Sequence, residues 1–272
     1  MKFSKYQGTG NDFIMIDNRE LSFNKNKAEI AALCHRRFGI GADGVILLQN
    51  APKNATDKQK YDFEMVYYNA DGSLGSMCGN GGRCAVRFAH HLGLFKRKTY
   101  FLAVDGAHEA ELKKREVRLK MKDVSHIEYN EENEYFFLDT GSPHYVEWVR
   151  ELEKYKVFEN GKAIRYNDRF REKGTNVNFI EKTNEFLINI RTYERGVEDE
   201  TFACGTGSVA AALVFSLKGD SKWAFTTGNF EILVKTLGGH LAVSFLKTGE
   251  HTFENIFLSG AAEKVFDGEI NK

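Results

Sequence analysis

The chain has 272 residues and a formal net charge of zero, so its charge favours neither nucleic acid nor a membrane surface as a partner. Its 42% hydrophobic content is enough for a sizeable core in one or two domains, and no run approaches the ~20 consecutive apolar residues of a membrane-spanning helix. The first residues lack the apolar run of a signal peptide, so the four cysteines are expected to be reduced thiols in the cytoplasm.

The first half of the chain predicts short strands and two helices. Asn24 is placed to cap a helix that runs to about Phe38, because its inner side is apolar and Gly39 follows it. Residues 50–60 are polar and predict a loop. Apolar runs and alternation predict strands at 3–6, 13–17, 45–48 and 63–68, and further strands from 100 to about 121 around turns at 105–106 and 113–115.

The second half of the chain repeats this order of elements. A helix is expected near residues 145–153, after a turn at 140–144 that resembles the turn at 9–12. Strands are expected at 136–139, 174–180, 186–192 and between 224 and 245, with breaks at 228–229 and 238–239. The repetition indicates two duplicated halves with a site between them, namely residues 1–122, joined by the tail 256–272, and residues 123–255.

Two short stretches repeat one cysteine motif at corresponding places in the two halves. Cys78 and Cys204 each begin the pattern Cys-Gly-x-Gly-x-x-x-Ala, and an apolar run that predicts a helix follows each of them. The two cysteines lie 126 residues apart. Each thiol is therefore expected at the N-terminus of a helix.

A helix start is a favourable place for an anion and for a reactive thiol. It presents backbone N–H groups and about half a positive charge, which lowers the pKa of a cysteine there and suits a carboxylate ligand. Two such helix starts facing one another would hold one carboxylate and bring two thiols to the neighbouring carbon. This is the geometry of a two-base racemase, in which one thiolate removes a proton and one thiol returns it on the opposite face.

Other uses of the cysteines agree less well with their spacing. Inert packing is common for a buried cysteine, and we expect it of Cys34 and Cys84. A zinc site would need closely spaced Cys or His pairs, which the sequence lacks, so no metal is expected. A thiol–disulfide redox pair stays an alternative, although the Cys-x-x-Cys spacing is absent. The glycine-rich stretches match neither a Walker loop nor a dinucleotide fingerprint, which argues against nucleotide binding.

Polar residues recur at the ends of the predicted strands, close to these motifs. Asn11, Asn69 and Asn176 lie in turns, where asparagine is common, but their recurrence at corresponding strand ends favours a binding role. Glu194 and Arg195 could form a solvated surface pair. Arg195, however, lies nine residues before the second cysteine, at the offset that Asn69 has from the first.

Taken together, these segments resemble the diaminopimelate epimerase family, and the likeness covers nearly the whole chain. The segments that carry it are Gly8–Phe13, Gly39–Gly44, Asn69–Ser73, Met77–Cys84, Gly141–His144, Tyr193–Gly196 and Ala203–Gly207. The resemblance implies an α/β (α+β) fold with two pseudo-symmetric domains, each a mostly antiparallel β-barrel wrapped around a central helix, and an active site in the cleft between them. It also implies an isomerase without a cofactor, closure on the substrate diaminopimelate, and often a homodimer.

The resemblance implies roles for individual residues as well. The acid and base thiols would be Cys78 and Cys204. The groups that bind the reacting α-carboxylate and amine would be Gly79, Asn80, Gly205 and Thr206. The residues that read the distal amino-acid end would be Asn11, Asn69, Asn176, Glu194 and Arg195, with possible support from His144, Ser142 and Gly44. Arg195 would take the distal carboxylate, for which a planar, two-pronged donor is suited.

The implied reaction interconverts LL- and meso-2,6-diaminoheptanedioate at one α-carbon, without pyridoxal phosphate, in lysine and peptidoglycan precursor biosynthesis. Many members carry Gln where this chain has Gly44, and Asn where it has Ser142, which bears on recognition of the distal end. One alternative is a racemase or epimerase of another amino acid, such as proline or hydroxyproline, whose members usually carry His in place of Asn80. A non-catalytic amino-acid-binding protein and a thiol–disulfide redox protein are alternatives from other classes.

Overall fold

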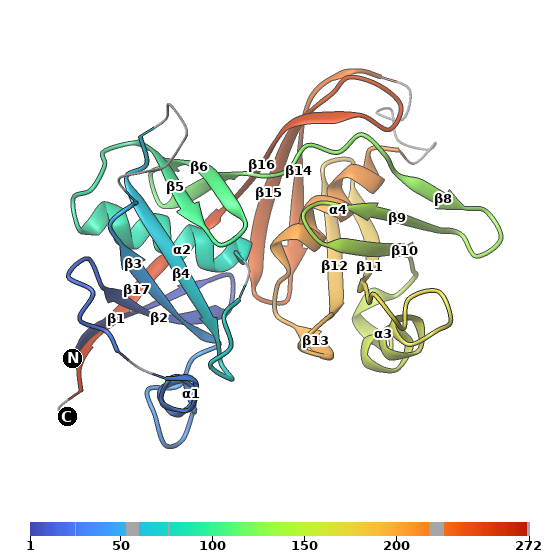
Figure 1. Cartoon of the computed structure of the whole chain (residues 1–272). Coiled ribbons are helices and arrows are strands. Elements are labelled where there is room, and N and C mark those ends of the chain that lie inside the picture. Colours follow the sequence, from blue (N-terminus) through green and yellow to red (C-terminus); the bar gives the residue numbers. More distant parts are fainter. Residues whose placement is uncertain (25, 53–59, 76, 218–225, 271–272) are drawn as a thin grey trace. The chain divides into compact units, whose positions relative to one another are not determined.

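The computed structural model describes residues 1–24, 26–52, 60–75, 77–217 and 226–270, and it divides into two compact units (Figure 1). The first unit comprises residues 1–119 and 260–272, and the second comprises residues 120–259. Most of the loop expected at 50–60, and the start of the strand expected from 224, lie outside the described residues. No helix in the part of the chain that is described has both the length and the apolar character needed to cross a membrane.

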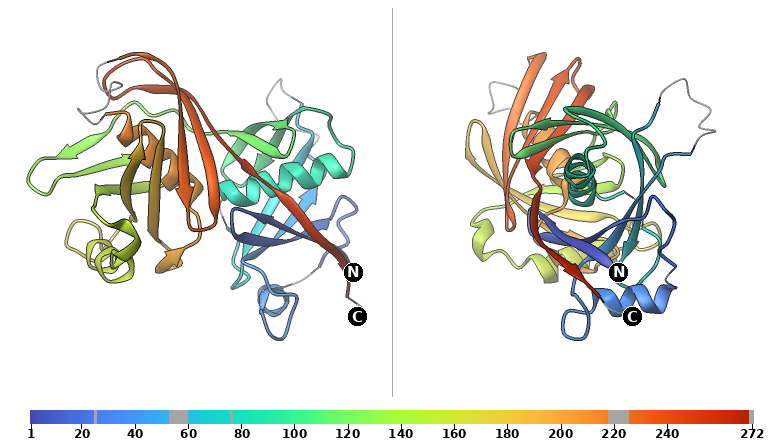
Figure 2. Two further views of the ribbon diagram at one scale, coloured as in Figure 1. Left: turned by 180° about the vertical axis from the view of Figure 1, so that it is seen from behind. Right: turned by 90° about the vertical axis from the view of Figure 1, so that its left-hand side faces the viewer.

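The first unit is a sheet curved around one central helix. Its strands are β1 (Lys2–Gly8), β2 (Asn11–Asp17), β3 (Gly44–Gln49), β4 (Phe63–Asn69), β5 (Lys98–Ala103), β6 (Gly106–Lys113), β7 (Glu116–Lys120) and β17 (Glu263–Glu269). They pair in the order β17–β1–β2–β3–β4–β5–β6–β7, and only the pairs β2–β3 and β4–β5 are parallel. The central helix is α2 (Gly79–His91), which packs against β1 to β4 and β17, and Figure 2 shows these strands around it.

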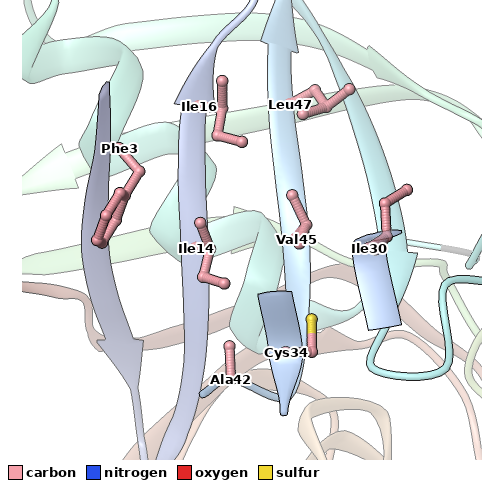
Figure 3. Packing of buried hydrophobic residues seen from close by; sticks show 8 residues of the cluster. All are labelled: Phe3, Ile14, Ile16, Ile30, Cys34, Ala42, Val45 and Leu47. Carbon is pink, nitrogen blue, oxygen red and sulfur yellow. The ribbon is translucent and has the colours of Figure 1, made fainter. Parts of the chain in front are cut away.

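A second helix, α1 (Lys27–Cys34), covers the outer face of this sheet. Ile30 and Cys34 of α1 pack with Ile14 and Val45 in the cluster drawn in Figure 3. On the inner face, Phe13, which precedes Ile14 in β2, lies against the first turn of α2. Because helices cover both faces, β2 and β3 are continuous apolar runs rather than alternating ones.

The helix expected from Asn24 to about Phe38 is shorter at both ends. Its cap is Asn26, whose side chain accepts from the Glu29 N–H while Glu29 accepts from the Asn26 N–H, so the reciprocal capping pair decides where the helix begins. The helix ends at Cys34, and Phe38 is 89% exposed, so no apolar contact extends it.

The second unit repeats the same plan around the helix α4 (Gly205–Phe215). Its strands are β8 (Glu128–Asn130), β9 (Tyr135–Asp139), β10 (Pro143–Trp148), β11 (Asn176–Asn184), β12 (Leu187–Glu194), β13 (Asp199–Thr201), β14 (Gly228–Thr236), β15 (Gly239–Lys247) and β16 (Phe253–Ala261), the last of which includes residues of both units. The pairs β9–β10, β11–β12 and β14–β15 are antiparallel, whereas β10–β11 and β12–β14 are parallel. The five pairs from β1–β2 to β5–β6 in the first unit alternate between antiparallel and parallel in the same order. The repeated order of elements that the sequence predicts is therefore present in the structure.

The helix expected near residues 145–153 is wrong. Residues 143–148 form β10, in which Tyr145 and Val146 pair with β9 on one side and β11 on the other. The aromatic and β-branched residues of this stretch, Tyr145, Val146 and Trp148, favour a paired strand over a helix. The helix of this half is α3 (Val157–Arg165), preceded by one 3-10 turn, Leu152–Lys154. The break expected at 228–229 is likewise wrong, because β14 begins there, whereas the break at 238–239 is the β14–β15 turn.

The apolar run after the second cysteine is the buried helix that its composition predicts. Every residue from Val209 to Phe215 is almost completely buried. The strands packed against it are β9 to β12, β14 and β15. A helix that is apolar all round is stable here because sheet encloses it on all sides, which makes it a rigid mount for the residues at its start.

Candidate functional site

Cys78 lies at the start of α2 in the first unit. Its backbone is extended, with φ −94° and ψ 131°, and the helix begins at the next residue, Gly79. The first hydrogen bond of the helix runs from the Gly82 N–H to the Cys78 carbonyl at 2.7 Å. No side chain in the described part caps this start and its first turn has no acidic residue, in contrast to α1. The positive end of the helix dipole is therefore not offset by a carboxylate of the helix's own first turn.

Three residues predicted to bind substrate lie at the edge of the sheet beside this helix start. Asn11 opens β2, Gly44 opens β3 and Asn69 ends β4, and the register pairs Gly44 with both Phe13 and Asn69. The Asn80 side chain donates from Nδ2 to Asn11 Oδ1 at 2.5 Å, which ties the first turn of α2 to β2. The register of three strands and the packing of α2 thus bring residues from four separate segments together.

A network of charged residues positions the Asn11 side chain. Its Nδ2 donates to Asp43 Oδ2 at 3.0 Å, and Asp43 forms an ion pair with Arg36 at 2.6 Å. Asp12 pairs with both Lys5, at 2.8 Å, and Arg36, at 2.7 Å. Burial opposes ionisation of Asp12, but hydrogen bonds from Arg36 and Lys5 outweigh it and lower the pKa of this carboxyl.

Cys204 has the same place in the second unit, at the start of α4. Its backbone is also extended, with φ −109° and ψ 115°, and the Ser208 N–H donates to its carbonyl at 2.9 Å. The Cys204 sulfur lies 3.5 Å from Thr206 Oγ1, and the Thr206 carbonyl accepts from Thr140 Oγ1 at 2.9 Å. The predicted residues Gly205 and Thr206 thus form the first turn of a buried helix, as Gly79 and Asn80 do in α2.

Asn178, on β11, is a residue of this region that the sequence did not identify. Its Nδ2 donates to the Tyr145 carbonyl at 2.8 Å and to His144 Nδ1 at 3.1 Å, while its Oδ1 accepts from Thr192 Oγ1 at 3.1 Å. A Cβ on Gly207 would lie 2.4 Å from Asn178 Oδ1 and 3.3 Å from the Cys204 sulfur, so the glycine lets α4 approach the amide. The available signal was a second asparagine, two residues after Asn176, beside the apolar residues of the strand.

His144 is fully buried and neutral. Since Asn178 uses its N–H to reach the Tyr145 carbonyl and His144 Nδ1, the proton of the imidazole is assigned to Nε2. Burial lowers the pKa of His144 to about 3. Its Nε2 is buried without a hydrogen-bond partner among the described residues, so it can still donate one hydrogen bond.

Asn176, Glu194, Arg195 and Ser142 are brought together at the matching edge of the second sheet. The Arg195 N–H donates to Asn176 Oδ1 at 3.0 Å, and its guanidinium donates to Ser142 Oγ at 3.3 Å and to the Lys173 carbonyl at 3.1 Å. These acceptors are neutral, and no carboxylate of the described residues forms an ion pair with Arg195. Glu194 accepts from Thr201 Oγ1 at 2.7 Å. The guanidinium is thus oriented by neutral acceptors, and a planar cation of this kind can pair with an anion.

The family model described as diaminopimelate epimerase matches residues 3–127 and 136–265. The chain belongs to the diaminopimelate epimerase family. The diaminopimelate epimerase of Flavobacterium psychrophilum is 49% identical over 272 residues, which covers 99% of this chain and 100% of that protein. Those of Chlorobaculum tepidum and Aquifex aeolicus are 44% and 39% identical, and cover 97% and 100% of this chain and 98% of each relative.

Solved structures share the fold at much lower identity. A Bacillus anthracis phenazine biosynthesis protein of the PhzF family aligns with a TM-score of 0.75 at 13% identity, covering 100% of this chain and 99% of that one. A hydroxyproline epimerase from Agrobacterium vitis aligns with a TM-score of 0.67 at 13% identity, covering 98% and 91%. At these identities the likeness concerns the fold, and it confirms the predicted α+β class with two similar domains.

Gly44 has no room for a side chain in this structure. A Cβ there would lie 2.4 Å from the Tyr68 carbonyl oxygen and 2.5 Å from the Tyr67 ring. That ring packs edge-on against Phe13, with centroids 6.0 Å apart. It also occupies the place that a Cβ on Gly75 would need. Tyr67 therefore occupies the volume that a longer residue at position 44 would need.

The other two cysteines have the surroundings of inert thiols. Cys34 packs in the cluster beneath α1, and Cys84 is completely buried within α2. Burial raises the pKa of Cys34 to about 11 and that of Cys84 to about 12, so both are neutral near pH 7. This agrees with the packing role expected of them.

A pocket in the first unit lies away from these groups. Its volume is about 1190 Å³, and it is found at the other end of β2, beside Asp17, Arg19 and Ile270. None of the residues predicted to bind substrate lines it. We therefore attach no role in the reaction to it.

Proposed function

We propose that the protein is a cofactor-independent isomerase that interconverts LL- and meso-2,6-diaminoheptanedioate, in lysine and peptidoglycan precursor biosynthesis. The observation that carries this proposal is the repetition of one half-site: Cys78 and Cys204 each precede the first turn of a buried helix, in units with the same order of strand pairings. Full-length relatives named diaminopimelate epimerase, up to 49% identical, support the choice of substrate.

In this proposal the two domains, residues 1–122 with 256–272 and residues 123–255, each contribute one thiol to a single site. One thiolate removes the α-proton, and the thiol on the opposite face supplies a proton to the same carbon. The roles exchange in the reverse direction. By resemblance, Cys204 is the acceptor and Cys78 the donor in the LL-to-meso direction.

The substrate-binding roles follow the same division. The α-carboxylate and amine of the reacting end are assigned to the first turns of the two helices, at Gly79, Asn80, Gly205 and Thr206. Backbone N–H groups there stabilise the charge that develops on the carboxylate as the weakly acidic α-proton leaves. The distal end is assigned to Asn11, Asn69, Asn176, Glu194 and Arg195, with His144, Ser142 and Gly44 in support.

Arg195 is the distal group for which the geometry supplies the clearest support. Its guanidinium is oriented by Ser142 and the Lys173 carbonyl and is not neutralised by a carboxylate of the described residues. A planar guanidinium can form two parallel hydrogen bonds with a carboxylate, which an amide or an ammonium group cannot do. Diaminopimelate has a second carboxylate, whereas proline and hydroxyproline do not.

A cytoplasmic location and a homodimer are part of the same proposal. None of the four cysteines, which all lie in the described part of the chain, forms a disulfide, which accords with a reducing compartment. The dimer rests on resemblance to the family.

The decisive test is incorporation of solvent deuterium at the α-carbon, measured by NMR in D2O without added cofactor. We expect exchange and epimerisation of diaminopimelate and no exchange of proline. Exchange of proline or hydroxyproline alone would favour the alternative racemase. Binding of diaminopimelate without exchange would favour a binding protein, and a functional Cys78–Cys204 disulfide with no exchange would favour a redox protein.

A further inference from the structure

Arg195 lies in a tight turn after β12, and the shape of this turn depends on Glu198. The Glu198 N–H donates to the Glu194 carbonyl at 2.8 Å, and the Glu198 carboxylate accepts from the Gly196 N–H at 3.0 Å. Gly196 has φ +91° and Glu198 has φ +59°, a left-handed conformation that is uncommon for a residue other than glycine. Glu198 thus closes the turn with both its backbone and its side chain.

Arg165, the last residue of α3, connects this turn to the loop 170–174. Its Nε forms an ion pair of 3.4 Å with the Glu198 carboxylate, and its Nη1 donates to the Phe170 carbonyl at 3.3 Å. The side chain of Arg165 is 13% exposed and that of Glu198 is 31% exposed, so solvent screens this pair less than a pair on the open surface. Arg165 therefore joins the two segments between which Arg195 lies.

The side chains of Arg165 and Arg195 both lie against Gly174. A Cβ on this glycine would be 2.7 Å from Arg195 Cδ and 2.8 Å from Arg165 Cζ, so the loop has no room for a side chain at this position. The carbonyl of the preceding residue, Lys173, accepts from Arg195 Nη1 at 3.1 Å. The direction of the Arg195 guanidinium thus depends on the position of this loop.

Two phenols complete the surroundings of the Glu198 carboxylate. Tyr193 donates to it at 3.3 Å, and Tyr166 also forms a hydrogen bond with it. Burial opposes ionisation of Glu198, but the Gly196 N–H, the Tyr166 hydroxyl and the charge of Arg165 outweigh it and lower the pKa of this carboxyl. A carboxylate with partners from the end of α3, from β12 and from the turn differs from an isolated surface ion pair.

We propose that the pair of Glu198 and Arg165 positions Arg195 for the distal carboxylate of the substrate. The pair acts through Arg195: it fixes the turn 194–198 on one side and the loop 170–174 on the other. Because Glu198 pairs with Arg165, the cation beside Arg195 is neutralised, and it does not compete for the same ligand. This inference rests on the proposed function and deepens it.

The first test needs no substrate. The mobility of the Arg195 side chain is measured in the free protein by ¹⁵N relaxation of its Nε–H group, and the signal is assigned by its loss in Arg195→Lys. We expect a rigid group in the wild type and an order parameter below about 0.6, typical of flexible groups, in Glu198→Ala. Glu198→Gln should give an intermediate value, because the amide oxygen can still accept from the Gly196 N–H while Arg165 loses its counterion.

The matched control is Glu200→Ala. Glu200 lies two residues further along the chain, and its carboxylate pairs with Arg191 at 2.6 Å instead of with Arg165. This variant removes a carboxylate–arginine pair from the same unit without removing the hydrogen bond to the Gly196 N–H. The order parameter of Arg195 should therefore stay at the value of the wild type.

The second test separates positioning from a purely structural role. In Glu198→Ala the KM for diaminopimelate should rise about 10-fold while kcat changes by less than about twofold, because a displaced guanidinium weakens binding and not proton transfer. In an Arg195→Lys background the same substitution should raise KM by less than about twofold, since both changes act on one interaction. A structural role alone would give additive effects.

Four outcomes would overturn the proposal: a flexible Arg195 in the wild type, a rigid Arg195 in Glu198→Ala, an equal gain in mobility in Glu200→Ala, or additive effects on KM. If Glu198→Ala does not fold, the comparison of Glu198→Gln with the wild type decides. A wild-type protein that does not exchange the α-proton of diaminopimelate would count against the proposed function, and the relaxation measurements would still decide whether Glu198 positions Arg195.

Discussion

The starts of α2 and α4 have the same backbone and different electrostatic surroundings. Both follow an extended cysteine, both lack a side-chain cap among the described residues, and both lie against sheets of the same pairing order. Beneath the first lies the charged Arg83, whereas the second has Val209, neutral His144 and Asn178. The two half-sites thus share the geometry that presents a thiol, while the buried residues one turn away differ between them.

The largest expected effect comes from removing either thiol. Cys78→Ala and Cys204→Ala should each abolish epimerisation, a loss of at least about 10²–10⁴-fold, because one face of the α-carbon then lacks its acid or base. The assay is the rate of conversion of LL- to meso-diaminopimelate. Cys34→Ala, in the core beneath α1, is the control and should keep its activity. Near-normal turnover by either active-site variant would show that the two half-sites are not used together.

Arg195→Lys should lower kcat/KM for diaminopimelate by about 10- to 100-fold, because lysine keeps the charge but cannot form two parallel hydrogen bonds, each worth about 1.5–3 kcal/mol. The fold, followed by circular dichroism, should not change. The control is Arg171→Lys, at a surface arginine paired with Asp168. An unchanged kcat/KM in Arg195→Lys would mean that the guanidinium does not bind the distal carboxylate of the substrate.

The glycines Gly207 and Gly81 hold corresponding positions in α4 and α2, and their alanine variants should behave differently. A Cβ on Gly207 would meet the fixed Asn178 Oδ1 at 2.4 Å, so we expect a loss of about 1–3 kcal/mol in unfolding free energy. A Cβ on Gly81 meets the flexible ends of Ile46 and Met65 at 3.1 Å and 3.5 Å. Gly81→Ala should therefore cost less. Urea unfolding measures both, and equal losses would refute the difference in packing.

His144 should add a dependence of stability on pH in the second half-site. Burial lowers the pKa of His144 to about 3 in the folded protein, so between pH 6.5 and 3 the unfolded chain binds a proton that the folded one does not. Stability should therefore fall with falling pH through this window, by about 1.4 kcal/mol per unit from this group. His144→Gln should reduce the slope of unfolding free energy against pH. An unaltered slope would mean that His144 is protonated in the fold.

Local sequence was enough to predict the two cysteine helices and the strands around them. The glycines after Cys78 and Cys204, and the apolar runs that follow, act within one or two turns, and α2 and α4 begin at the next residue as expected. Prediction was wrong where pairing with other segments decided the structure: a helix was expected near residues 145–153, but pairing with β9 and β11 made residues 143–148 a strand. Strand formation depends on hydrogen bonding and packing against neighbouring strands, and a local pattern does not contain that information.

The sequence by itself determined the duplicated order of elements, the two thiols at helix starts, and the recurrence of asparagines at strand ends. Only the tertiary structure decided how these groups are surrounded. Arg83 reads as an ordinary helical residue, yet the packing of β1 and α2 buries it with neutral acceptors. Asn178 reads as an interruption in an apolar strand, yet it joins Tyr145, His144 and Thr192. Burial and charge pairing depend on segments far apart in the chain, and therefore on the fold rather than on any local pattern.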